Sequence, residues 1–198
     1  MRKIGWAGVM IAVLAGVAGV PRAMAQAEST SFQKIRLQAF GMGSYVNPDY
    51  GGAKKNAGAT LGGDVNFGQL FHRFEPSLEL RAVGSVGRVS NQYVYSGGPR
   101  VEFDYGRFHP YALATFGVGQ INYAVPVMYP SGLYTHDSSM VTTVGGGLDY
   151  IVSPRWAVRA DLTMQNWKVG TEAPGFSPTA VSLGLRYRFH FHDKTSPF

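Results

Sequence analysis

Histidine, serine and an acidic residue stand next to one another in the tract His136-Asp137-Ser138-Ser139. These residue types serve as base, nucleophile and orienting acid in acyl-transfer sites. Such a site also needs hydrogen bonds between side chains that meet in space, which adjacency along the chain does not supply. A nearby proline and glycine make the tract typical of a solvated loop. We therefore expect no catalytic residue here.

Two histidines, His190 and His192, would lie on one face of an extended strand. A metal ion needs at least one further ligand, and only His72 and His109, in predicted turns at the same rim, could offer one. No spacing in the sequence is diagnostic of a metal site. We expect no metal site and no cofactor.

The composition excludes several classes of protein. Of 198 residues, 45% are apolar and only 15% are charged, against roughly 25% charged in an ordinary soluble domain. The 26 glycines argue against a helical bundle, and the 11 Tyr and 12 Phe argue against disorder. The absence of cysteine excludes disulfide, thiolate-metal and thiol-nucleophile chemistry. Glycine clusters at 117–119 and 145–147 open no predicted helix, so they are not phosphate loops.

The start of the chain has the pattern of a secretory signal peptide. A basic segment precedes an uncharged apolar stretch over 4–20, and Ala23-Met24-Ala25 is a small-x-small cleavage site, with a second site ending at Ala27. We predict a signal peptide helix over 1–25 and one domain over 26–198. Cleavage removes three of the 18 basic residues, and the remaining net charge of about +3 is too small to indicate nucleic-acid binding.

From residue 33 onward, apolar residues recur with a period of two, which indicates strands. In seven of eight runs, one face is apolar and the other is polar, charged or glycine. A typical run is about 9–13 residues long, close to the length of a membrane-spanning strand and longer than the average soluble strand. The runs cover 35–45, 59–68, 78–87, 100–105, 110–122, 140–150, 156–165 and 181–192.

The connections between the runs alternate between long and short. The short ones cover 70–75, 106–109 and 151–155, and the long ones cover 46–58, 88–98, 123–139 and 168–177. Short periplasmic turns and long outer loops are typical of outer-membrane barrels. We therefore predict an all-β fold, an eight-stranded antiparallel up-and-down transmembrane β-barrel with both barrel termini in the periplasm.

The apolar face distinguishes this barrel from a soluble, lipocalin-type barrel, whose outer face is wet. Its aromatic residues gather near strand ends, as in the girdles at bilayer interfaces: Tyr45, Tyr105, Tyr150, Trp156, Tyr187, Phe189 and Phe191. Between them, we expect Leu80, Val158, Leu162 and Leu185 to face lipid near mid-bilayer.

The last run, Val181-Ser-Leu-Gly-Leu-Arg-Tyr-Arg-Phe-His-Phe191, carries alternating hydrophobics that end in an aromatic residue. With this run, the chain resembles the small outer-membrane barrels of the OmpA/OmpX type. The resemblance implies a barrel in the outer membrane of a Gram-negative envelope, with outer-membrane lipid as its surroundings and the barrel-assembly machinery as a partner during insertion. It also implies an assembly signal formed by Leu183, Leu185, Tyr187, Phe189 and Phe191.

Some small barrels, the outer-membrane lipid A deacylases, carry a His-x-Ser pair like that of His136 and Ser138. Those enzymes also need a nearby Glu, and this chain has none between Glu102 and Glu172. We therefore predict that the protein is not an enzyme.

Charged residues on the polar face should point into the lumen. Acids fall mainly on the second to fourth runs and bases on the seventh, eighth and first, so we expect two opposite walls of charge. Enclosed charges must pair, and we predict a cross-lumen network that plugs the periplasmic half. Above it we expect a shallow cup lined mainly by Ser44, Ser85, Gly87, Thr143 and Gly145. The expected network consists of Arg36, Asp64, Glu79, Arg81, Glu102, Asp104, Asp149, Arg159, Asp161, Arg186 and Arg188.

These features favour a structural or surface-interaction role, and we expect a monomer without nucleic acid as a partner. The alternatives are a narrow, porin-like channel for small solutes and, with less support, a lipid A-modifying enzyme. Val127, Met128, Tyr129 and Tyr134 lie in the third long connection and suit a binding loop. We favour the alternative that these tyrosines anchor the loop at the outer lipid interface.

Overall fold

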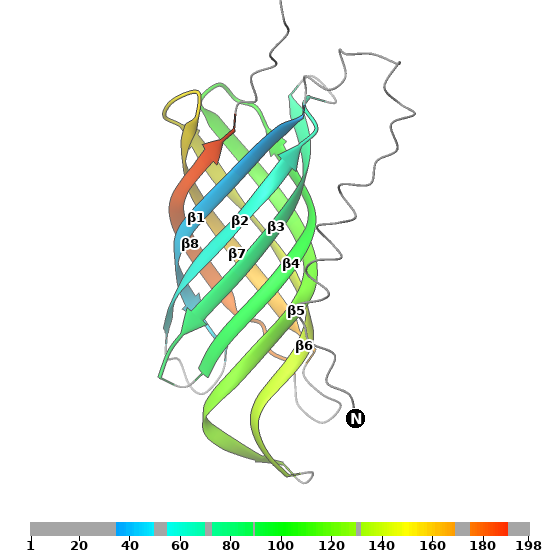
Figure 1. Ribbon diagram of the computed structural model, residues 1–198, viewed down its shortest axis with the longest axis vertical. Coiled ribbons are helices and arrows are strands. Elements are labelled where there is room, and N and C mark those ends of the chain that lie inside the picture. The colour runs from blue at the N-terminus through cyan, green and yellow to red at the C-terminus, as the bar shows by residue number, and fades with distance from the viewer. Residues whose placement is uncertain are drawn as a thin grey trace, which may run out of the picture. The chain divides into compact units, whose positions relative to one another are not determined.

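A computed structural model describes residues 35–49, 55–69, 73–88, 90–129, 132–168 and 175–189. Its strands are β1 (Arg36–Asn47), β2 (Asn56–Asn66), β3 (Phe74–Val86), β4 (Ser90–Phe103), β5 (Phe108–Tyr129), β6 (Gly132–Ile151), β7 (Trp156–Trp167) and β8 (Thr179–Arg188). Each strand pairs antiparallel with its neighbours, and β8 pairs with β1 to close a barrel (Figure 1). The predicted eight-stranded up-and-down barrel is confirmed. The predicted signal peptide, 1–25, lies outside the described residues.

Strand geometry decides which side chains enter the barrel, because successive side chains point to opposite faces. On β3, Glu79 and Arg81 are buried, whereas Leu78 and Leu80 are 49% and 57% exposed. The apolar face is therefore outside and the polar face inside, the reverse of a soluble ligand-binding barrel. Across the described helices and strands, no helix is long and apolar enough to cross a membrane.

The outward face carries the predicted leucines and aromatic residues. Leu80, Leu162 and Leu185 are all more than half exposed, and Val158 is half-buried. The predicted girdle residues Tyr45, Tyr105, Tyr150, Trp156 and Phe189 are exposed, Tyr187 is half-buried, and Phe191 lies outside the described residues.

The barrel has two different ends. At one end, which we call the turn end, β2, β4, β6 and β8 finish and β1, β3, β5 and β7 start. The opposite end is the hairpin end, where β5 and β6 extend beyond the other strands (Figure 1). Pairing of β4 with β5 stops at Ser90 and Tyr123, and pairing of β6 with β7 starts at Val141 and Trp167. Beyond these residues, the described part of the chain shows β5 and β6 paired only with each other, as far as Tyr129 and Gly132.

Two of the predicted long loops are wrong. Most of 88–98 belongs to β4, and most of 123–139 belongs to the paired ends of β5 and β6. Glycine, serine and proline suggested turns in these segments. In β4, however, Gly98 lies where a Cβ atom would collide with the carbonyl oxygen of Ala114. Glycine there permits close approach of backbones inside a strand rather than a turn.

Candidate functional site

The inward face near the turn end holds a network of buried charges. Four arginines and five carboxylates lie within ion-pair distance of one another, and none of their side chains is more than 2% exposed. The members are Asp64, Glu79, Arg81, Arg100, Glu102, Asp149, Arg159, Asp161 and Arg186. We call this set the charge network.

Arg100 is the hub of the charge network. Its Nη2 donates to Glu102 Oε2 at 2.7 Å and to Asp149 Oδ2 at 2.8 Å. Its Nη1 lies 3.4 Å from Asp64 Oδ1, and its Nε lies 3.6 Å from Glu79 Oε2. One guanidinium from β4 therefore touches carboxylates of β2, β3, β4 and β6.

Arg159 and Asp149 form the most regular pair. They are direct cross-strand partners on β7 and β6. Arg159 Nε donates to Asp149 Oδ1 at 2.8 Å, and Nη2 donates to Oδ2 at 2.9 Å. This two-pronged geometry is the strong form of an arginine–carboxylate contact. Arg159 Nη1 also reaches Glu79 Oε2, 3.5 Å away on the opposite strand β3.

Two further arginines span the lumen. Arg186 of β8 donates through Nη1 to Glu102 Oε2 of β4 at 3.0 Å and to Asp149 Oδ2 at 2.8 Å. Arg81 of β3 donates through Nη2 to Asp161 Oδ2 of β7 at 3.0 Å and through Nε to Glu79 Oε1 at 2.8 Å. Strands on opposite sides of the barrel are thus joined through its centre.

Aromatic rings pack against the same guanidinium groups. The Arg100 guanidinium carbon lies 4.1 Å from the centre of the Tyr111 ring. That of Arg159 lies 4.3 Å from the Phe40 ring and 5.1 Å from the Tyr111 ring. Both rings are buried, so they fill space and supply cation–π attraction where water is excluded. Tyr111 also donates its hydroxyl to Asp161 Oδ2 at 3.4 Å.

Three predicted members stand apart from the charge network. Arg36 pairs with Glu75 at 3.3 Å near the start of β1. Asp104 lies in a turn and accepts hydrogen bonds from the Gln69 amide and the Gly106 N–H. Arg188 forms no ion pair within the part of the chain that the structure describes.

The structure differs from the predicted two walls of charge. The departure is Arg100, which stands among the acids of β2 to β4, whereas Arg81, Asp149 and Asp161 were expected exceptions to the division. The prediction missed Arg100, Glu75 and His109, whose Nδ1 lies 2.6 Å from Glu102 Oε1.

The hairpin end of the lumen is filled by apolar side chains. The set is Val94, Ile121, Val141, Trp167 and Phe176, with Val83 and Tyr123 packed against it, and we call it the apolar cluster. The Trp167 and Phe176 rings stack with centroids 5.1 Å apart. Trp167 Nε1 donates to Gln165 Oε1 at 2.9 Å, which satisfies the indole inside the barrel.

The apolar cluster occupies the end where a shallow cup was predicted. Ser44, Ser85 and Thr143 are buried there as expected, but the bulky side chains beside them come from β4, β5, β6 and β7. Val94 lies in a segment that was assigned to a loop, and Trp167 lies outside the predicted run 156–165, so neither side chain could be assigned an inward direction.

The tract 136–139 lies on β6, at the part that pairs only with β5. His136 Nδ1 lies 3.3 Å from the Thr135 hydroxyl, and Asp137 accepts the N–H of Ser138. Ser139 donates its hydroxyl to two backbone carbonyls. The described residues of this tract thus form no His–Ser or His–Asp hydrogen bond.

The residues that the structure describes contain no group of three His, Cys, Asp or Glu side chains that could hold a metal ion. His109 instead contacts Glu102 and the carbonyl of Gly106. His72, His190 and His192 lie outside the described residues, as do the side chains of Tyr129 and Tyr134.

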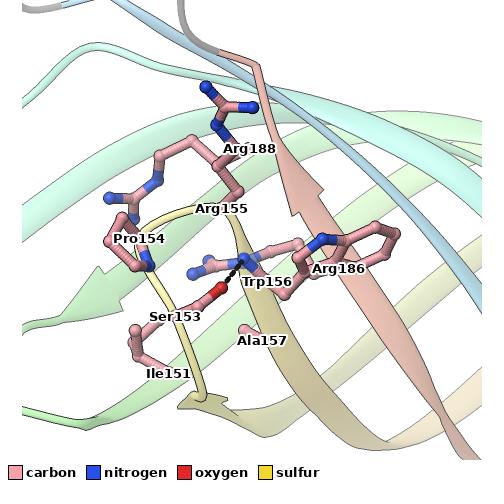
Figure 2. A pocket seen from close by; sticks show the side chains of 8 residues that line it. All are labelled: Ile151, Ser153, Pro154, Arg155, Trp156, Ala157, Arg186 and Arg188. Atoms are coloured by element: carbon pink, nitrogen blue, oxygen red, sulfur yellow. Dashed lines mark hydrogen bonds between the residues drawn. The ribbon is translucent and has the colours of Figure 1, made fainter.

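A depression at the turn end is lined by the connection between β6 and β7 and by the last residues of β8 (Figure 2). Arg155, Trp156 and Arg188 line it, together with Arg186 of the charge network. The Arg188 N–H donates to the Arg155 carbonyl at 2.8 Å, which ties the turn to β8.

Comparisons with known proteins agree with this architecture. Residues 10–189 match the family model of the outer membrane protein β-barrel domain. Curated proteins include no match. Among solved structures, Neisserial surface protein A aligns at 17% identity with a TM-score of 0.51, over 78% of this chain and 97% of that one.

Two other solved barrels align less closely. Ail of Yersinia pestis gives 14% identity and a TM-score of 0.47 over 79% of this chain and 98% of that one. The N-terminal barrel of OprF from Pseudomonas aeruginosa gives 16% identity and a TM-score of 0.45, over 79% of this chain and 97% of that one. The match to the family model covers nearly all of the barrel, and the chain therefore belongs to the outer-membrane protein β-barrel family, as a small eight-stranded barrel of the outer membrane.

Proposed function

We propose that this protein is a closed barrel that serves as a membrane scaffold and presents a surface for interaction. The closed barrel is supported by the charge network, in which arginines of β7 and β8 reach carboxylates of β3 and β4 across the lumen. A narrow eight-stranded interior is just wide enough for side chains to fill it. The apolar cluster closes the other half of the lumen in the same way.

Solute permeability tests this closure. Liposomes that contain the folded protein should swell no faster in small sugars or amino acids than liposomes without protein. Liposomes that contain a large porin provide the positive control. Swelling with the smallest solutes would instead assign the protein to the alternative function of a narrow channel.

The surface is supplied by the protruding hairpin, residues 124–129 of β5 and 132–140 of β6. Within the described residues, these segments pair with no strand other than each other, although the Met140 carbonyl accepts the N–H of Lys168 at 3.5 Å. The outer edge of each strand therefore presents backbone N–H and C=O groups, which can add a strand from a partner. Met128 and Met140 are 81% and 74% exposed, and adaptable methionine side chains suit such contacts.

A shortened hairpin tests the interaction role. Asn122 and His136 are cross-strand partners, so replacing 123–135 with Asn-Gly should join them through a two-residue turn. We expect cells that display the shortened protein to lose adhesion to those purified matrix and surface proteins that bind wild-type cells. Unchanged adhesion, at equal surface amounts of folded protein, would remove this role.

We further propose that the turn end faces the periplasm and the protruding hairpin faces the outside. The chain contains no cysteine, so single substitutions report position without background. Ser138→Cys should react with a membrane-impermeant maleimide on intact cells, and Arg107→Cys should react only after the outer membrane is opened. The opposite labelling pattern would reverse the orientation.

The outward stripe of β8 supports recognition by the barrel-assembly machinery during insertion. Leu183, Leu185 and Phe189 are exposed and Tyr187 is half-buried, all on one face. We expect Phe189→Ala to slow accumulation of the folded barrel in cells while leaving unassisted folding into detergent micelles unchanged. Equal effects in both settings would show that Phe189 acts on stability and not on recognition.

A further inference from the structure

Three connections at the turn end close with the same pair of residue types. Each ends in an arginine and is followed by an aromatic residue that begins the next strand: Arg73-Phe74, Arg107-Phe108 and Arg155-Trp156. All three arginines are exposed. The three rings are exposed to nearly the same fraction, 48%, 49% and 48%. The repetition on three separate hairpins indicates a shared surrounding medium and not a local packing need.

Each of these aromatic residues packs, in an edge-on or tilted arrangement, against an aromatic residue of the neighbouring strand. Phe74 meets Phe103, Phe108 meets Tyr150, and Trp156 meets Tyr187, with ring centroids 5.1, 5.2 and 4.9 Å apart. Each pair is also a direct cross-strand pair. Outward aromatic rings at strand ends sit at the border between hydrocarbon and headgroups, so these pairs mark that depth on three sides of the barrel.

The backbone holds each arginine just beyond that border. The carbonyl oxygens of Arg73, Arg107 and Arg155 accept the N–H groups of Asp104, Ile151 and Arg188 at 2.8, 2.9 and 2.8 Å. One residue along a strand is about 3.3 Å. The arginines therefore leave the barrel about one residue further toward water than the rings, at the depth of headgroup phosphates.

The three guanidinium groups are free to bind an anion. Within the described residues, none of the three forms an ion pair, and Arg73 lies 5.8 Å from the Tyr105 ring centre. The acids of this end have other partners, since Glu75 pairs with Arg36 and Asp104 accepts from Gln69. Figure 2 shows one of these turns, in which Arg155 lies beside Arg188, a second cation.

We propose that Arg73, Arg107 and Arg155 bind the phosphate groups of anionic phospholipids in the leaflet that meets the turn end. Guanidinium groups bind phosphate oxygens through paired hydrogen bonds. The aromatic pair beside each arginine would contact the glycerol and upper acyl chains of the same lipid. This site is independent of the lumen and of the protruding hairpin.

Native mass spectrometry tests the proposal. The folded barrel is released from micelles that contain equal amounts of phosphatidylglycerol and phosphatidylcholine. Wild-type protein should retain up to three phosphatidylglycerol molecules in preference to phosphatidylcholine. In a titration at low salt, each single Arg→Gln variant should weaken phosphatidylglycerol binding at its own site by about fivefold.

The matched control changes the same charge at the other end of the barrel. Lys55, Arg88 and Lys168 are exposed residues of the hairpin end. Their combined replacement by glutamine should leave phosphatidylglycerol retention unchanged, whereas the combined replacement of Arg73, Arg107 and Arg155 should abolish the preference. Heat-modifiable gel mobility verifies that each variant is folded, and the single variants carry the test if the triple variant does not fold.

Three results would overturn the proposal. The first is a wild-type protein that retains both lipids equally, and the second is an equal loss in the two triple variants. The third is binding of inorganic phosphate alone that is as tight as binding of phosphatidylglycerol, because the site would then recognise a free ion without the lipid.

Discussion

Arg100 has carboxylates of Asp64, Glu79, Glu102 and Asp149 within 3.6 Å, more than any other arginine of the charge network. A buried charge is tolerated only where it is paired, so each of these carboxylates depends on its cations. Arg159 also joins Asp64 and Glu79 to Asp149, but Arg100 in addition contacts Glu102 of β4.

Removal of Arg100 should therefore be among the most destabilising single substitutions. We expect Arg100→Ala to lower the free energy of unfolding by about 3–5 kcal/mol, because four buried carboxylates each lose one of their cations and the network is left with more buried anions than cations. The exposed turn variant Arg107→Ala should change it by less than about 0.5 kcal/mol. Reversible urea unfolding in lipid vesicles measures both values, and similar losses in the two variants would contradict the hub role.

Depth on the outward face provides a second test at single residues. Leu162 lies in the middle of β7 and is 59% exposed, whereas Trp156 is at its turn end. Leu162→Arg should cost about 2–4 kcal/mol in lipid, and Trp156→Arg should cost about 1 kcal/mol or less from charge burial. Folding titrations in the same vesicles compare the two, and equal costs would mean that the bilayer does not cover β7 as we describe.

At the residue scale, alternation alone predicts direction. It places Glu79, Arg81, Asp149 and Arg159 inside, and the structure brings these side chains together. It could not single out Arg100 as the hub. The run of alternation was predicted to start at that residue, whereas β4 starts at Ser90 and places Arg100 well inside the strand.

At the scale of elements, β5 and β6 combine two environments in one hairpin. Strand β5 is paired on both sides between Tyr111 and Tyr123, and β6 between Val141 and Tyr150. Toward the tip of the hairpin, each has a neighbour on one side only among the residues that the structure describes. Backbone hydrogen bonds of such a two-stranded ribbon open with much lower free energies than those inside a closed sheet.

Hydrogen exchange should reveal this boundary. We expect amides in 124–129 and 132–138 to exchange far faster than amides in 111–121 of the same hairpin, because local opening of the ribbon does not disturb the barrel. Nuclear magnetic resonance of the folded protein in lipid nanodiscs resolves the two groups. Uniform protection along both strands would show that contacts other than the pairing between β5 and β6 hold the protruding hairpin.

The two misassigned loops show what composition conceals at this scale. Segment 90–98 reads Ser-Asn-Gln-Tyr-Val-Tyr-Ser-Gly-Gly, which is typical of a turn-rich loop. In the barrel its tyrosines face outward and Val94 packs in the apolar cluster. Pairing with β3 and β5 outweighs the weak intrinsic preference, which is why strand propensity depends on neighbours.

For the whole molecule, the two fillings of the lumen act in series. In the closed barrel that we propose, the apolar cluster contributes stability by burial, and the charge network closes the turn end. Trp167 is fully buried, so Trp167→Ala should lower the free energy of unfolding by about 3–5 kcal/mol. Because the charge network is left intact, the same variant should remain impermeable to ions. An ion leak from Trp167→Ala would show that the apolar cluster alone closes the barrel.

Planar-bilayer conductance of the folded wild-type protein tests the closed lumen most directly. We predict no unitary conductance steps in molar potassium chloride at moderate voltage, since no ion can pass side chains that are paired across the barrel centre. The single variant Arg186→Ser should also stay closed, because the apolar cluster is intact, whereas its combination with Trp167→Ala should give brief openings under the same conditions. Stable conductance steps in the wild-type protein, at a density that matches the number of inserted barrels, would contradict the account.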